Sequence, residues 1–238
     1  MNKLKEKWIS IIILTVILIA VIFNANDFQK WLLNIVSNGK GTIIDFNFKN
    51  LFYLHIILTL KITVLSMVVF FIMLIIYSTK LINKICSFFK IFSPLYKVFY
   101  CIFIIGLFIF SLTGGRNRII ISLTIGSAFY LMKIILKHMK NIDHCIIETS
   151  KAIGMSESNI LFKVKIPMCK KYILKEAGKV LIINLNALVL FSFLGVNGLG
   201  SVIVKAVENK NLIPIALISI TLFLTSFIVL LLSNEELD

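Results

Sequence analysis

The stretch ETSKAIGMSESNILFKVKIP, residues 148–167, decides how the rest of this 238-residue chain is interpreted. It is polar and lies between long apolar runs. Gly154 can adopt a positive φ, so it can end one short helix and turn the chain. Ser156 suits the N-cap of a second helix, and Pro167 suits the first turn of a third, where its missing N–H costs nothing. The stretch therefore predicts two short helices joined by a hinge, followed by a new helix.

The same stretch carries a partly apolar face. Its members are Ile160, Leu161 and Val164, with the more distant Ile153 and Met155. A face of this kind on a polar loop predicts contact with another surface.

The composition is that of a membrane protein. Apolar residues make up 59% of the chain and the mean hydropathy is +0.99, whereas soluble domains average about 45–50% apolar residues. The formal net charge of +14 comes mostly from lysines near the ends of apolar runs. That placement is typical of cytoplasmic loops and of attraction to anionic lipid, and no basic soluble region is present to bind nucleic acid.

The apolar runs predict six membrane-spanning helices, at about residues 8–24, 51–77, 91–112, 119–136, 172–194 and 213–232. Residues 28–36 predict a short interfacial helix on the outer side. Lysine-rich segments at residues 78–90, 133–140 and 163–179 indicate the cytoplasmic side. Both termini and the 148–167 stretch are therefore expected inside the cell.

Lys61 is a charged residue within the second predicted span. An ionisable residue at such a position is a candidate for function. Snorkelling toward the outer interface is the favoured alternative, because the lysine stem is long and the span has residues to spare. The sequence leaves the role of Lys61 open.

Glu148, Gly154 and Pro167 have the spacing of a known signature: Glu-Ala-Ala, three residues, Gly, nine residues, Ile-x-Leu-Pro. The stretch resembles the EAA loop in the permease subunits of ABC importers. The departures from the signature are Thr149 and Ser150 for the two alanines, Val164 for the Ile and Ile166 for the Leu. The resemblance covers roughly residues 51–232 and is strongest over residues 143–200, where GVNGLG at 195–200 resembles the GxxGLG turn of several branches, including the methionine permeases.

The resemblance implies an all-α membrane protein with the type I ABC importer permease fold, a five-helix core plus an N-terminal helix. Residues 1–50 would form the N-terminal helix and outer segment. Residues 51–233 would form the permease core with a coupling loop at 143–167, and residues 234–238 a short tail. The implied location is the bacterial inner or cytoplasmic membrane.

The resemblance also implies partners. The coupling loop of the family docks into a groove of an ABC ATPase subunit, and its apolar face would supply contact. The expected partners are ATPase subunits, an extracytoplasmic solute-binding protein, the lipid bilayer, and a second copy or a related permease subunit; the sequence does not choose between the last two. The residues implied for ATPase coupling are Glu148, Ala152, Gly154, Met155, Ser156, Ile166 and Pro167.

Polar residues in the fifth predicted span are candidates for the solute path. Asn184 and Asn186 need partners in an apolar helix, and two residues apart they cannot both face one path. Hydrogen bonding between helices is the alternative role for either. The candidate path residues are Asn184, Asn186, Ser192, Gly195 and Asn197.

The transported solute stays open between two groups. The GxxGLG turn favours the methionine and quaternary-amine branches. The six-span layout resembles the sulfonate, taurine and nitrate branch, whose usual acidic residue near Phe193 is absent here.

The chain has no phosphate-binding loop for ATP, no metal-ligand spacing and no nucleophilic triad. We therefore expect a transport subunit without an ATPase site, catalytic residues, metal or cofactor. The alternative is a self-sufficient secondary transporter or channel, which would predict inverted repeats or paired intramembrane charges.

Overall fold

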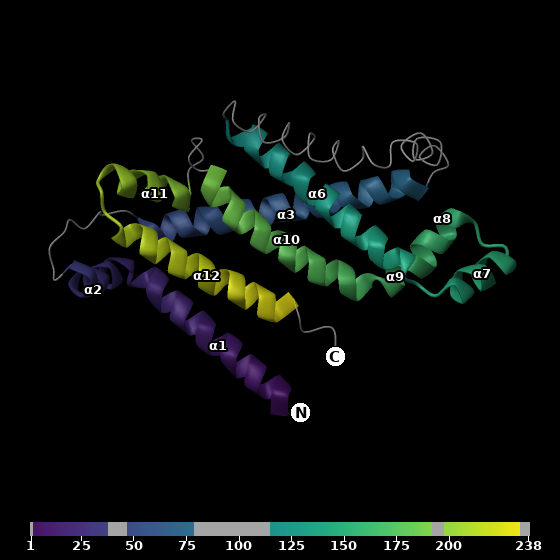
Figure 1. Cartoon of the computed structure of the whole chain (residues 1–238), viewed down its shortest axis with the longest axis horizontal. Coiled ribbons are helices and arrows are strands. Elements are labelled where there is room, and N and C mark those ends of the chain that lie inside the picture. The colour runs from purple at the N-terminus through teal and green to yellow at the C-terminus, as the bar shows by residue number, and fades with distance from the viewer. Residues whose placement is uncertain (1, 38–46, 79–114, 192–197, 234–238) are drawn as a thin grey trace. The chain divides into compact units, whose positions relative to one another are not determined.

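The computed structural model describes residues 2–37, 47–78, 115–191 and 198–233, and these form helices with short connections (Figure 1). No strand occurs in these four ranges, so the all-α prediction is confirmed for them. The predicted third span at residues 91–112 lies outside the described residues. So do the tail at residues 234–238 and three candidate path residues, Ser192, Gly195 and Asn197.

The first three helices are α1 (Asn2–Phe23), α2 (Ala25–Ser37) and α3 (Phe48–Ser78). After the gap, α6 (Arg116–Lys140) leads into α7 (His144–Ala152) and α8 (Glu157–Ile160). A π-helical turn (Leu161–Lys165) and α9 (Ile166–Met168) follow. The chain continues with α10 (Lys170–Phe191), α11 (Leu199–Glu208) and α12 (Ile213–Ser233).

Three of these helices, α3, α6 and α12, are long and apolar enough to cross a membrane. They correspond to the predicted second, fourth and sixth spans. The pair α1 and α2 is bent by 90° and gives a fourth candidate if it counts as one broken span. The α2 helix covers the segment predicted to lie at the interface. The α10 helix covers the predicted fifth span but carries Lys175, Glu176 and Lys179 in its first half, and it is not among the candidates.

The chain divides into two compact units. The first comprises Met1–Lys61, Gly114–Arg116 and Leu181–Glu235. Its apolar core joins the bend between α1 and α2, the start of α3, and the helices α11 and α12. The buried residues of that core are Val21, Ala25, Phe48, Leu199, Val202, Leu217 and Ile218.

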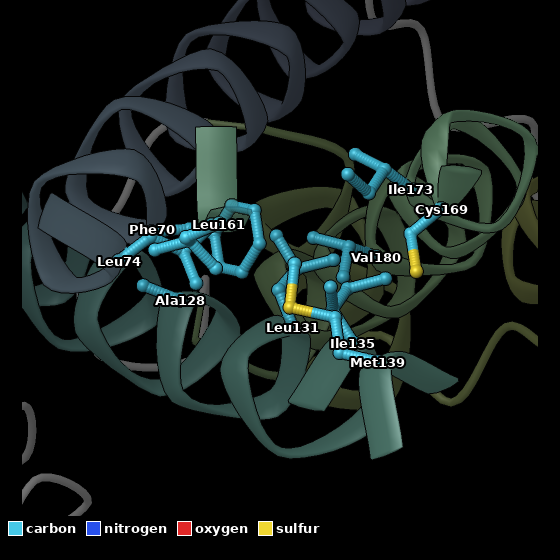
Figure 2. Packing of buried hydrophobic residues seen from close by; sticks show 10 residues of the cluster. All are labelled: Phe70, Leu74, Ala128, Leu131, Ile135, Met139, Leu161, Cys169, Ile173 and Val180. Atoms are coloured by element: carbon cyan, nitrogen blue, oxygen red, sulfur yellow. The ribbon is translucent and has the colours of Figure 1, made fainter. Parts of the chain in front are cut away.

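The second unit comprises Ile62–Thr113, Asn117–Val180 and Glu236–Asp238. Figure 2 shows its core, to which the second half of α3, the α6 helix and the first half of α10 all contribute. Leu161 of the π-helical turn and Cys169 are buried in the same cluster. This cluster therefore anchors the polar stretch that the sequence singled out.

Candidate functional site

The candidate site is the elbow, which we define as residues 143–167. Its first helix, α7, ends in a Schellman motif. The N–H of Gly154 donates to the carbonyl of Lys151 at 2.9 Å, and the N–H of Met155 donates to the carbonyl of Ser150 at 3.1 Å. Gly154 has φ of 86°, a region that side chains disfavour. The predicted turn at Gly154 is confirmed.

Glu148, the first residue of the signature, is exposed on α7. Its Oε1 lies 3.2 Å from Nδ1 of His144, and both side chains are exposed. The N-cap of α7 is Asp143, whose Oδ1 accepts the N–H of Cys145 at 3.0 Å. Glu148 is therefore free to change partners at the surface without unwinding α7.

The second helix of the elbow begins as the sequence predicts. Ser156 is the N-cap of α8, and its Oγ accepts the N–H of Asn159 at 3.3 Å. The carboxylate of Glu157 meets the ammonium of Lys151 at 2.9 Å, which joins α8 to α7 across the turn. Figure 1 shows α7 and α8 as separate short helices on either side of this turn.

The end of the elbow differs from the prediction. Pro167 does lie in the first turn of α9, but no loop precedes that helix. The chain passes directly from α8 through the π-helical turn, in which the N–H of Ile166 donates to the carbonyl of Leu161, five residues back. A proline ring clashes with the carbonyl four residues earlier, here that of Lys163. A wider turn directly before Pro167 gives that carbonyl room.

The apolar face of the elbow is divided between two surroundings. Ile160 and Leu161 are 0% and 5% exposed, so they pack inside this chain, and the expectation that they contact a partner is wrong. Ile153 is 77% exposed and lies beside the Gly154 turn, while Ile146 and Phe162 are exposed as well. A surface for another protein would therefore be centred on Ile153.

The residues implied for coupling are mostly accessible. Met155 and Ile166 are half-buried, and Ile166 packs against the core of the second unit. The exposed members are Glu148, Ala152, Gly154, Ser156 and Pro167.

The thiol of Cys169 lies directly after the elbow and is buried. Burial raises its pKa because the thiolate is desolvated, and the positive charge of Lys165 opposes this shift. A buried thiol of this kind is unreactive compared with the exposed Cys145 of α7.

The two asparagines of α10 lie on different faces of the helix. Asn184 is fully buried, whereas Asn186 is exposed and its Nδ2 donates to the carbonyl of Ile182 at 2.9 Å and to Oγ of Ser226 on α12 at 3.4 Å. The two side chains therefore have different surroundings, and the assignment of either to a solute path stays a prediction. Lys61 is exposed along α3.

Sequence reasoning missed a row of buried polar side chains on α3. Nε2 of His55 lies 3.0 Å from the carbonyl of Leu185 on α10, and Nδ1 of His55 has no hydrogen-bond partner among the residues that the structure describes. Thr59, Thr63 and Ser66 follow at helical spacing and are also buried. The signal was present, because a histidine within an apolar run marks a helix face turned away from lipid.

Glu176 on α10 was also missed. It is 4% exposed, its Oε1 accepts from Nζ of Lys179 at 2.6 Å, and its Oε2 has no hydrogen-bond partner within the described ranges. No group of three or more metal-ligating side chains occurs among the residues that the structure describes.

Comparison with known proteins identifies the family. A model of the binding-protein-dependent transport system inner membrane component matches residues 84–234. A 97-residue segment, 41% of this chain, is 27% identical to the carnitine transport permease protein OpuCD of Listeria monocytogenes and covers 44% of it.

A segment of the same length is 28% identical to two proteins of Bacillus subtilis. They are the glycine betaine/carnitine/choline transport system permease protein OpuCD and the choline transport system permease protein OpuBD, of which 42% and 43% are covered. The alignments span less than half of each relative. The family match covers more than half of this chain, and the apolar helices fit a protein that crosses the membrane several times. The chain therefore belongs to the family of binding-protein-dependent transport system inner membrane components, the permease components of ABC importers.

Proposed function

We propose that this chain is the permease subunit of an ABC importer for a small quaternary ammonium solute, and that the elbow couples it to a separate ATPase subunit. The observation that carries the coupling role is the geometry at Gly154. Two short helices are held at a fixed turn by the Schellman motif and by the Lys151–Glu157 ion pair. The side chain of Ile153 is exposed at that turn.

The elbow has what a mechanical contact requires. Its outer surface is exposed, and its inner side is fixed by Leu161 in the core of the second unit. A push on Ile153 or Ala152 would be transmitted through a rigid turn to the packed helices α3, α6 and α10. Closure of two ATPase subunits on ATP would move two such elbows together and switch the access of the solute path. The chain itself would hold neither ATP nor a catalytic site.

The assignment of a quaternary amine as the solute is supported by two observations. The relatives with 27–28% identity are named for transport of carnitine, choline and glycine betaine. The GVNGLG segment at residues 195–200 resembles a turn of the methionine and quaternary-amine branches. Sulfonates, taurine and nitrate become the less favoured group. An extracytoplasmic binding protein would deliver the solute, and a second copy or a related permease would complete the path.

The rest of the layout follows from the same proposal. Residues 51–233 would form the permease core, with six spans in total and with the N-terminus and elbow on the cytoplasmic side. At most one of Asn184 and Asn186 would line the solute path, because the two side chains lie on different faces of α10. Family membership favours this importer over a self-sufficient secondary transporter or channel.

Uptake measurements test the proposal. Deleting the gene in its host should abolish energy-dependent uptake of radiolabelled glycine betaine, choline or carnitine, and a plasmid copy should restore it. Taurine and nitrate serve as controls that should be unaffected. Loss of taurine or nitrate uptake, with all three quaternary amines unchanged, would overturn the assignment of the solute.

A further inference from the structure

A cavity of about 240 Å³ lies within the second unit, between the end of α3, the end of α6, the start of α7 and the π-helical turn. Its polar lining consists of Tyr77, Lys140, His144 and Lys165. Its apolar wall includes Leu136, Ile142, Ile147 and Leu161. Pockets for drug-sized ligands usually measure about 300–1,000 Å³, so this one suits a small head group with part of an apolar tail.

The lysines of the cavity are available for a ligand. In the described part of the chain, neither Lys140 nor Lys165 forms an ion pair. The neighbouring acids already have partners, since Asp143 caps α7 and Glu148 meets His144. The carbonyl end of α6 disfavours an anion here, so the two ammonium groups have to supply the attraction.

The cavity also lies at the ends of two helices that are long and apolar enough to cross a membrane. Tyr77 and Lys140 stand at the ends of α3 and α6, two helices suited to cross the bilayer. Tyrosine and lysine favour the interface between head groups and acyl chains. A ligand with a negative head and an apolar tail would match the polar and apolar walls together.

We propose that this cavity binds the phosphate of an anionic phospholipid at the membrane surface, and that the bound lipid supports the elbow. Lys140 and Lys165 contact the phosphate, and Tyr77 donates a hydrogen bond to it. The start of the acyl chain lies along Ile142, Ile147 and Leu161. Because α7 and the π-helical turn form two of its walls, occupancy of the cavity restrains the elbow on its membrane side.

The test measures the thermal unfolding midpoint of the purified full chain in a neutral detergent. Short-chain phosphatidylglycerol should raise the midpoint, while phosphatidylcholine of the same chain length should not. Inorganic phosphate is the third probe. A rise with phosphatidylglycerol alone supports a lipid ligand. An equal rise with inorganic phosphate would show that the cavity binds phosphate and would overturn the proposal that the ligand is a lipid.

Charge variants locate the effect. Each lysine near an anionic surface contributes about fivefold in affinity. The double variant Lys140→Gln with Lys165→Gln should therefore bind phosphatidylglycerol with about thirtyfold lower affinity. The matched control is Lys163→Gln with Lys170→Gln, which removes the same charge from exposed positions outside the cavity. Equal weakening in both double variants would overturn the site in favour of general surface attraction.

A second readout does not depend on the charge variants. The thiol introduced by Ile147→Cys should be alkylated more slowly when phosphatidylglycerol is added. Cys145 is exposed and outside the cavity, so its rate should not change. If saturating phosphatidylglycerol left the alkylation rate of the introduced thiol unchanged, binding in this cavity would be contradicted.

Discussion

Lys151 of α7 and Glu157 of α8 form an ion pair of 2.9 Å that bridges the turn at Gly154. Both side chains are more than half exposed, so the pair contributes little to global stability, about 0.2–1 kcal/mol. Its position gives it a different use, because it is a side-chain link between the two helices of the elbow. It therefore tests whether the angle of the elbow matters for coupling.

We expect Lys151→Glu to reduce transport-coupled ATP hydrolysis while leaving the thermal midpoint almost unchanged. Two negative groups would then repel each other across the turn. Reversing both charges, Lys151→Glu with Glu157→Lys, should restore most of the coupling because the attraction returns. ATPase activity and solute uptake in proteoliposomes measure both effects. Failure of the double reversal to recover any coupling would show that the pair does not set the angle.

Gly154 should be the most sensitive backbone position of the elbow. A Cβ there would meet none of the described residues within 4 Å, so steric crowding is not the obstacle. The obstacle is φ of 86°, at which an L-residue costs about 1–2 kcal/mol. Gly154→Ala should lower the unfolding midpoint, and the β-branched Gly154→Val should also weaken ATPase binding and transport without removing the protein from the membrane.

Gly126 provides the matched control. It lies in the middle of α6, and a Cβ there also meets no atom within 4 Å in the part of the chain that the structure describes. Gly126→Ala should raise the midpoint, since glycine inside a helix costs about 0.5–1 kcal/mol relative to alanine. If Gly154→Val couples normally, the role given to Gly154 is wrong.

Lys210 should be a position at which stability can be gained. The α11 helix ends in the same motif as α7, with Lys210 donating to Val207 at 3.0 Å and Asn211 donating to Ala206 at 2.8 Å. Lys210 has φ of 52°, where glycine is preferred. Lys210→Gly should therefore stabilise the protein by roughly 1 kcal/mol, measured as a higher midpoint in detergent.

The control for that variant is Lys205→Gly, in the last turns of the same helix. It removes the same side chain but places glycine at a helical position, which costs about 1 kcal/mol. The two variants should move the midpoint in opposite directions. A loss of stability in Lys210→Gly would mean that the lysine side chain matters more than the backbone.

Cys169 should require a higher pH for alkylation than an ordinary thiol does. Burial raises its pKa and Lys165 only partly opposes this, so less thiolate is present at a given pH. Mass spectrometry after timed iodoacetamide treatment across a pH series would give the alkylation rates of Cys169 and of Cys145. Lys165→Gln removes the opposing charge and should shift the Cys169 profile to still higher pH. A profile for Cys169 equal to that of Cys145 would contradict its burial.

Cys145 reports the side of the membrane on which the elbow lies. It is exposed on α7, two residues after the N-cap. In a background with Cys86→Ser, Cys101→Ser and Cys169→Ser, a membrane-impermeant maleimide should label inverted vesicles and spare intact cells. Labelling of intact cells would place the elbow outside and exclude any contact with a cytoplasmic ATPase.

Local chemistry explains which features could be predicted. Gly154 and Ser156 act through their own backbone and side chain, so the turn and the cap were readable from residues 154–156 alone. The all-α class and three of the spans followed from long apolar runs. Residues that act through distant partners were not readable: the hydrophobicity of Ile160 and Leu161 cannot say whether a core or a partner covers them.

Other features were missed because weak rules govern them. Lysine is an uncommon residue at positive φ, so the second Schellman motif at Lys210 carried no signal. His55 and Glu176 were readable as ionisable residues near or within apolar runs, but their contacts with Leu185 and Lys179 depend on packing. Pro167 was the only sequence signal for the π-helical turn, and a proline more often indicates the beginning of a helix.

The π-helical turn at Leu161–Lys165 has a consequence for the angular setting of the elbow. It accommodates one residue more than an ordinary turn of the helix that runs on to α10. Deleting that extra residue would rotate the part of the elbow before the turn by about 100° about the helix axis, relative to the helix that follows. Leu161 would leave the core and Ile153 would face a new direction. The number of residues in this segment therefore determines the direction in which the elbow faces.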